Sequence, residues 1–164
     1  MSQRSSTQKF VHRRLLQPFW RLQRSLTLGA QGVVIDGAGR VLLVRHTYKS
    51  GWCFPGGGVE KGETVHAALA RELHEECGVV IDSAPELFGV YSNESHFPGD
   101  HVVLFVVRHW HRTHVPAPNN EIEAQDFFVP KDFFAPLPAP ADCPSSTQRR
   151  LAEIFTNAPR SELW

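Results

Sequence analysis

The sequence is short of cysteine, of long apolar runs and of net charge. Its 164 residues include three cysteines, widely spaced and odd in number, which argues against a disulfide framework or a Cys-x-x-Cys metal clamp. No apolar run approaches the roughly 18 residues of a membrane span, and the N-terminus lacks the apolar core of a signal peptide. The formal net charge is zero, so no overall basic field attracts a nucleic acid polymer or a membrane. We expect a single-domain cytoplasmic protein, because a reducing compartment suits unpaired cysteines.

Acidic residues are also missing from the first 35 positions, which carry several arginines and one lysine. Apolar residues recur in this segment at the spacing of one helix face. They are Val11, Leu15, Phe19, Leu22 and Leu26, interrupted by Pro18. The pattern predicts a basic amphipathic helical extension over residues 1–26, before a domain over residues 27–164. The extension would pack on the domain or on a second subunit in a homodimer, or it would be a membrane-surface or targeting helix.

Strand and helix patterns alternate along the rest of the chain. Apolar runs predict strands at 28–35, 40–46, 52–54, 86–92, 101–110 and 121–129. The run PGGG is expected to end the third strand, and the strand at 101–110 is apolar enough to be central. One helix is predicted from Thr64, as N-cap, to Cys77, before Gly78, and a second over 145–155, opened by Ser145 or Ser146. A proline-rich connector at 135–144 precedes it. This order predicts an α/β or α+β layered domain.

Three glutamates gather on the helix predicted up to Cys77. At about 100° per residue, Glu72, Glu75 and Glu76 form one stripe beside the apolar stripe that packs on the core. Like charges three and four positions apart on a helix repel, and Arg71 alone cannot balance all three. A solvated acidic face is the simplest explanation of such a stripe.

The glycine-rich run before this helix favours a different explanation. The segment PGGGVEKGE adds Glu60 and Glu63, and its glycines let the backbone approach a ligand and expose carbonyl oxygens. Carboxylate and carbonyl oxygens suit a hard divalent cation such as Mg²⁺ or Mn²⁺. A bound cation would turn the repulsion into coordination energy, so we favour a metal site.

The spacing of these residues resembles the signature box of the Nudix hydrolases. The nine specified positions of that box all agree, and they are Gly57, Glu63, Arg71, Glu72, Leu73, Glu75, Glu76, Gly78 and Val79. The preceding GWCFPGG also resembles the lead-in that is usual in the family. The resemblance implies an α/β/α sandwich with a central mixed β-sheet. It also implies hydrolysis of a diphosphate linked to another moiety, often a nucleoside, with Mg²⁺ or Mn²⁺ as cofactor.

The resemblance also implies roles for individual residues. The metal ligands would be Glu72, Glu75 and Glu76, together with the backbone carbonyl of Gly56. The general base would be Glu76 or, as second choice, Glu72. In some members of the family the base comes from a distant loop instead, and Glu94 is the candidate for that variant.

Other box residues would support these groups. Arg71 would orient the carboxylates by ion pairing, with Glu63 in the same network. Gly57 would shape the loop and Gly78 would stop the helix. The backbone of Gly57 and Gly58 is also a candidate contact for the substrate.

Outside the box, Glu121 resembles a further metal-associated carboxylate of many relatives, with Glu123 as the alternative by strand alternation. An exposed strand-end glutamate is an equally good explanation. His109, His111 and His114 alternate as in a transition-metal site, but solvent-facing histidines at a strand end are favoured.

The residues that mark substrate classes in the family give no positive answer. Glu94 and Ser95 stand where ADP-ribose hydrolases of the family have a proline. His96 and Phe97 stand where hydrolases of dinucleoside polyphosphates have a tyrosine. A small nucleoside diphosphate derivative is therefore the expectation. Aromatic side chains could stack on its base, and they are Phe97, Tyr91, Phe127 and Phe128, although aromatic residues in a sheet are more often core.

Two other functions fit parts of the sequence. A non-catalytic nucleotide sensor or partner-binding module would usually have lost box carboxylates, and this chain keeps them. An isomerase of prenyl diphosphates would typically need a reactive cysteine, and Cys53 precedes the glycine run.

Overall fold

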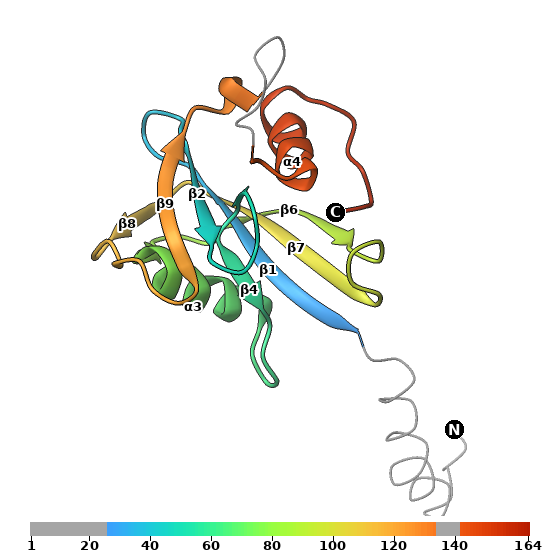
Figure 1. The fold of residues 1–164 in the computed structure, drawn as a ribbon, viewed down its shortest axis with the longest axis horizontal. Coiled ribbons are helices and arrows are strands. Elements are labelled where there is room, and N and C mark those ends of the chain that lie inside the picture. Colours follow the sequence, from blue (N-terminus) through green and yellow to red (C-terminus); the bar gives the residue numbers. More distant parts are fainter. Residues whose placement is uncertain (1–25, 134–141) are drawn as a thin grey trace, which may run out of the picture.

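The computed structural model describes residues 26–133 and 142–164 (Figure 1). The helical extension predicted over residues 1–26 lies almost entirely outside the described residues, as does most of the proline-rich connector.

A mixed four-stranded sheet forms the centre of the fold. Its strands run in the order β4-β1-β7-β6, and their bounds are Gly56–Gly58, Thr27–Val34, Asp100–Val107 and Glu86–Ser92. Strands β1 and β7 are parallel, whereas β4 and β6 run antiparallel to their neighbours. Strand β7 is buried over six consecutive residues and has a neighbour on each side, so its predicted central position is confirmed.

Two smaller sheets complete the strand structure. One has the order β3-β2-β9, with bounds Trp52–Cys53, Val41–His46 and Ile122–Phe128. The other pairs β5 (Val79–Ile81) with β8 (Trp110–Arg112). A short 3-10 helix, η2 (Pro130–Phe133), follows β9.

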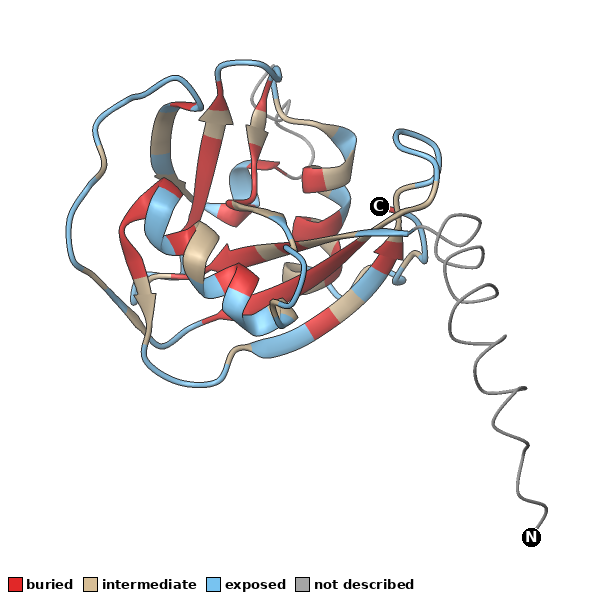
Figure 2. Ribbon diagram, turned by 90° about the horizontal axis from the view of Figure 1, so that it is seen from below, coloured by how far each residue is buried: buried red, intermediate tan, exposed pale blue. Residues whose placement is uncertain are grey.

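Helices α3 (Val65–Cys77) and α4 (Ser145–Phe155) lie on opposite faces of the central sheet (Figures 1 and 2). On one face, Leu69 and Leu73 of α3 pack in a core cluster with Ala30 and Val34 of β1. On the other face, a second cluster joins Val33 of β1 and the following Ile35 to Leu151 of α4. The predicted α/β/α sandwich is therefore confirmed. None of the described helices is long and apolar enough to cross a membrane.

Both ends of α3 follow the prediction. The hydroxyl of Thr64 accepts a hydrogen bond from the amide of Ala67 at 3.1 Å. Gly78 ends the helix in the left-handed region, with φ of 66°. At the start of α4, however, Pro144 holds the N-cap position rather than one of the predicted serines.

The glycine run does not simply end a strand, as the sequence predicted. Gly56, Gly57 and Gly58 form β4 and pair with Gln31, Ala30 and Gly29 of β1. Gly56 has φ of 135°, and a Cβ atom there would collide with the carbonyl oxygen of Ala30. Glycine has a low intrinsic preference for strands, so the close approach to β1 is what explains strand β4.

The sequence predicted a single strand over residues 101–110, but the structure divides this region between two strands. Strand β7 ends at Val107, and Trp110–Arg112 leave the central sheet to pair with β5. The exposed residues Arg108 and His109 separate the two strands, and sequence periodicity does not show that the pairing partner changes there.

We predict that Gly56→Ala destabilises the protein by about 1–3 kcal/mol, since an alanine at this φ is strained and its methyl group clashes with β1. Gly58→Ala is the matched control, because a Cβ atom at Gly58 meets nothing within 4 Å. Urea unfolding of both variants measures the difference. Equal stability of the two variants would show that β4 does not need a glycine at position 56.

Candidate functional site

The acidic edge of α3 lies against the glycine strand β4. The amide of Gly56 donates a 2.8 Å hydrogen bond to Oε2 of Glu76. A Cβ atom on Gly57 would lie 2.5 Å from Oε1 of Glu72. The absence of side chains on β4 therefore lets two carboxylates of the helix reach the backbone of the sheet.

Arg71 holds the surrounding carboxylates in place. Its guanidinium makes two hydrogen bonds to Glu63, at 3.0 and 3.1 Å, and one of 2.7 Å to Glu72. It also donates to the carbonyl of Gly58 at 3.0 Å and lies 3.4 Å from Glu75. These bonds raise the pKa of Arg71, and the bond to Arg71 lowers the pKa of Glu63. The guanidinium of Arg71 thus interacts with three glutamates and makes no described hydrogen bond to Glu76.

The three glutamates of α3 differ in exposure. Glu76 is only 5% exposed, Glu72 is half buried and the side chain of Glu75 is 59% exposed. Burial raises the pKa of Glu76 to about 8, with a further contribution from the charges of Glu72 and Glu121 against the opposing bond from Gly56. Burial also raises the pKa of Glu72. The ionised cluster is therefore unfavourable without a cation.

His46, at the end of β2, is the site residue that the sequence analysis missed. One ring nitrogen of His46 and one oxygen each of Glu76 and Glu121 lie within 4.8 Å of one another. His46 is 7% exposed, and its Nδ1 has no hydrogen-bond partner among the described residues. Burial lowers the pKa of His46, which favours the neutral imidazole. The available signal was a histidine that ends a buried strand shortly before the glycine run.

A β-bulge decides which glutamate of β9 joins the cluster. Arg45 pairs with Ala124, but the next residue, His46, pairs with Ile122, so Glu123 is an extra residue on β9. Glu123 turns to Arg45, with Oε2 3.2 Å from Nε. Glu121, rather than its alternative Glu123, lies beside Glu76.

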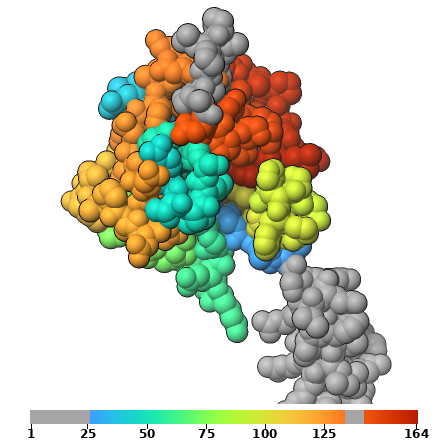
Figure 3. Space-filling view, viewed as in Figure 1, coloured from blue at the N-terminus to red at the C-terminus, as the bar shows by residue number. Residues whose placement is uncertain are grey.

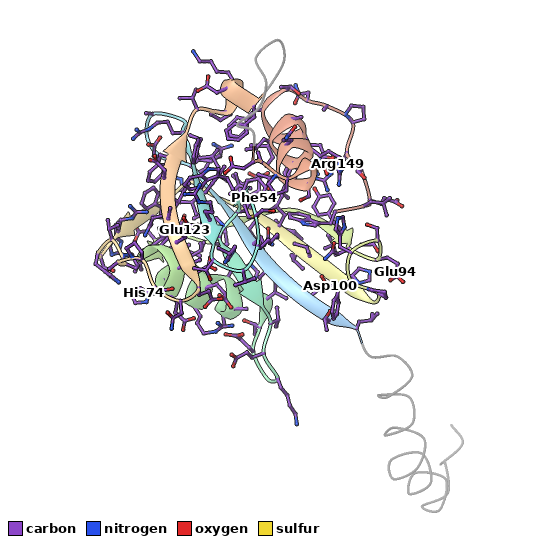
Figure 4. All side chains as sticks on the ribbon, in the orientation of Figure 1. Phe54, His74, Glu94, Asp100, Glu123 and Arg149 are labelled. Carbon is purple, nitrogen blue, oxygen red and sulfur yellow. The ribbon has the colours of Figure 1, made fainter. Side chains whose placement is uncertain are left out.

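The predicted loop residues lie elsewhere. Glu94 accepts a 2.7 Å hydrogen bond from the amide of Gly99, which ties it to its own loop between β6 and β7. Figure 4 shows Glu94 on the opposite side of the molecule from Glu123. Phe97, 58% exposed, belongs to the same loop. The structure therefore does not bring the predicted Phe97 contact or the predicted Glu94 base to the carboxylate cluster, because β1 lies between β4 and the two strands that this loop joins.

The three downstream histidines are exposed, as favoured from the sequence. Nδ1 of His111 pairs with Asp82 at 2.7 Å. Within residues 26–133 and 142–164, His46, Glu76 and Glu121 are the set of three His, Cys, Asp or Glu side chains whose ligand atoms all lie within 4.8 Å of one another.

The other aromatic candidates and Cys53 belong to the core. Tyr91 is buried, and Phe128 packs edge-on against Trp52 at 4.8 Å. Cys53 is also buried, and this burial raises the pKa of its thiol. A thiol with a raised pKa is a poor nucleophile, which argues against the isomerase alternative.

A pocket of about 420 Å³ lies next to the cluster of His46, Glu76 and Glu121, and His46 lines it. It lies between the β2–β3 loop and the side chains of Glu123 and Asp142. Figure 3 shows this loop and the segment of β9 side by side on one face. Arg45 faces the carboxylates of Glu123 and Asp142 at 3.2 and 3.5 Å. Lys49 also lines the pocket, and no described carboxylate lies within 4 Å of its amino group. The pocket therefore carries one cation that is not neutralised by a described ion pair.

Fold and site together define an α/β/α sandwich with a partly buried carboxylate cluster at one edge of its central sheet. A family model described as the NUDIX domain matches residues 26–147, which is most of the chain. The chain therefore belongs to the NUDIX family.

Individual relatives carry different names. The chain is 34% identical over 103 residues to an ADP-ribose pyrophosphatase of Methanocaldococcus jannaschii, covering 61% of this chain and 59% of that protein. It is 37% identical over 87 residues to an 8-oxo-dGTP diphosphatase of Proteus vulgaris, covering 49% and 75%. The chain thus spans less than two thirds of the first relative.

The fold is similar to that of the MutT NUDIX hydrolase from Burkholderia pseudomallei, with a TM-score of 0.62 and 22% identity. That match covers 79% of this chain and 98% of the other. At this identity the likeness concerns the fold alone.

We predict that Glu76→Gln stabilises the metal-free protein at pH 8 by roughly 2–4 kcal/mol, because each pKa unit corresponds to about 1.4 kcal/mol. The pKa of Glu76 rises from 4.5 to about 8 on folding, so the folded protein holds this proton more tightly. The stabilising contribution is full below pH 4.5 and is lost as the pH rises through about 8. The difference between the variant and the parent protein should therefore nearly vanish at pH 4.5.

Unfolding in chelator at several pH values tests this prediction. Glu75→Gln is the control, since the side chain of Glu75 is exposed and loses little hydration on folding. A Glu76→Gln variant that is less stable than the parent protein at pH 8 would contradict the proposed cost of burying this carboxylate.

Proposed function

We propose that the protein is a Mg²⁺- or Mn²⁺-dependent hydrolase that cleaves a diphosphate linkage in a nucleoside diphosphate derivative. The observation that supports this proposal most strongly is the buried Glu76 carboxylate. It lies beside further carboxylates, and no described ion pair with Arg71 balances its charge. Membership of the NUDIX family supports the reaction class. The names of the relatives support a nucleotide substrate without selecting one.

The residues present suit a divalent cation. Carboxylate oxygens of Glu72, Glu75, Glu76 and Glu121 would hold it, with the carbonyl of Gly56 as a further ligand. When bound, the cation would neutralise phosphoryl oxygens and lower the pKa of an attacking water.

The protein groups around the cation would set its position and accept the proton. Arg71 fixes Glu72 and Glu63 through its hydrogen bonds. The amide of Gly56 holds Oε2 of Glu76 and leaves Oε1 free to accept a proton from water. Glu76 remains our first choice as general base, with Glu72 second, since Arg71 already occupies Oε1 of Glu72.

The pocket beside His46 suits the rest of the substrate. Lys49 would contact a phosphate oxygen, and Tyr48, 71% exposed, offers a ring face to a base. Gly57 and Gly58 would present backbone to the diphosphate, and Gly58 has open space where a side chain would be.

A nucleotide sensor without turnover is the alternative from another class. It would bind a nucleotide with the metal present and leave it intact. Localisation in the cytoplasm and assembly as a homodimer remain predictions. Comparison of the full chain with residues 27–164 by size-exclusion chromatography would test whether the N-terminal segment makes the dimer.

We predict that the protein with Mg²⁺ or Mn²⁺ releases a nucleoside monophosphate from a member of a panel of nucleotide sugars, dinucleotides and nucleoside triphosphates. Glu75→Gln and Glu76→Gln should each lower kcat by about 100-fold or more, since metal and base are lost. Glu86→Gln, at the exposed start of β6, is the matched control. Chromatography of the products, with and without chelator, gives the measurement. Full activity in both Glu75→Gln and Glu76→Gln would reject the metal role.

We predict that Lys49→Met raises KM by about 10-fold and changes kcat little, because a lost phosphate contact of roughly 1.4 kcal/mol weakens binding by that factor. Lys131→Met, at an exposed position of η2, is the control. Steady-state kinetics on the best substrate of the panel measures both. An unchanged KM in Lys49→Met would show that Lys49 and its pocket do not bind the substrate.

A further inference from the structure

We propose that His46 is a nitrogen ligand of a divalent cation that Glu76 and Glu121 also bind. The site would then be a mixed nitrogen and oxygen site, which suits a transition metal such as Mn²⁺ or Co²⁺ better than Mg²⁺. The inference rests on the proposed function, because it names the kind of metal ion that the same site uses.

His46 is not a histidine satisfied by the core. Its side chain is 7% exposed, and within the described residues its Nδ1 atom has no hydrogen-bond partner. Buried polar atoms almost always have a partner, and an orphaned one needs an explanation such as an absent ion. The ring of Tyr48 lies beside the imidazole, with ring centroids 5.1 Å apart and ring planes tilted by 39°.

The backbone holds His46 next to Glu121. The β-bulge between Arg45 and His46 changes the register of β2 against β9 at this point. Directly after it, the amide of Thr47 donates to the carbonyl of Glu121 at 2.9 Å, and the hydroxyl of Thr47 donates to the carbonyl of Asn120 at 2.6 Å. These bonds fix the ends of both strands. Bulges commonly reorient a side chain next to a functional site, and this one sets His46 and Glu121 together.

The third ligand comes from an independent element. Glu76 is on α3, and the amide of Gly56 fixes its carboxylate. The ligand atoms of the three residues lie within 4.8 Å of one another. At metal–ligand distances near 2.1 Å, two ligands of one ion are about 4.2 Å apart on opposite sides and about 3.0 Å apart when adjacent. Three ligands cannot all lie opposite one another, so the donor atoms must move together by roughly 1–2 Å on binding, and the exposed Glu121 can supply much of this movement.

The chemistry of the donors selects the cation. Mg²⁺ prefers oxygen ligands and keeps several waters, whereas an imidazole nitrogen suits transition metals. Glu72 and Glu75 offer oxygen alone and lie toward Arg71. The nitrogen is therefore confined to the side of the cluster that faces the pocket.

Pulsed electron paramagnetic resonance of bound Mn²⁺ tests the ligation directly, because nitrogen-14 bound to the ion modulates the echo. We expect imidazole modulation in the parent protein and in His111→Gln, a control at the exposed position of β8. His46→Gln should lose the modulation, and its Kd for Mn²⁺ should rise about 10-fold or more. Its Kd for Mg²⁺ should change less. Bound Mn²⁺ without nitrogen modulation in the parent protein, or modulation that persists in His46→Gln, would overturn the inference.

If His46→Gln does not fold, the unaltered protein still decides the matter. Labelling its histidines with nitrogen-15 should replace the nitrogen-14 signal, and an unchanged signal would overturn the inference. Turnover is measured separately on the same samples. Nitrogen ligation without cleavage of any diphosphate would contradict the proposed hydrolase function and support His46 as a metal ligand. Cleavage without nitrogen ligation would contradict only the role of His46 as a metal ligand.

Discussion

The carboxylate of Glu76 is almost removed from water, and other acidic groups lie around it. Arg71, the arginine of the signature box, is engaged by Glu63, Glu72 and Glu75 and makes no described hydrogen bond to Glu76. One amide hydrogen bond, from Gly56, is what the described backbone offers this carboxylate. Such a group is stable as an anion only with a further positive charge nearby. The rest of the site follows from this need, because the glycine strand, the arginine network and the bulge all shape the space around one carboxylate.

The fold supports this unfavourable group with ordinary packing. Leu69 and Leu73 anchor α3 on the central sheet, and the caps at Thr64 and Gly78 fix both ends of the helix. The helix therefore cannot rotate to expose Glu76. Natural proteins commonly accept such a cost where function needs it, and the stability of the two-sided core offsets it.

The sequence alone predicted the parts of this fold that depend on local chemistry. The caps and the apolar stripe of α3 are local, and the acidic stripe follows from helix periodicity. The parts that depend on distant backbone were missed. Strand β4 depends on Gly56, which pairs with Gln31 and has no room for a Cβ atom beside the carbonyl oxygen of Ala30, whereas glycine in a sequence usually indicates a loop. His46 depends on one bulge, which strand alternation does not reveal, whereas Glu121 was preferred to Glu123 from the family resemblance and not from the strand pattern.

The most direct measurement of the central claim is the free energy of unfolding at pH 8, first in chelator and then with saturating Mg²⁺ or Mn²⁺. A ligand that binds the folded state at 100 times its Kd stabilises it by about 2.7 kcal/mol. We expect a gain of this order in the parent protein and most of that gain to be lost in Glu76→Gln. Identical unfolding of the parent protein with and without the cation would contradict the account.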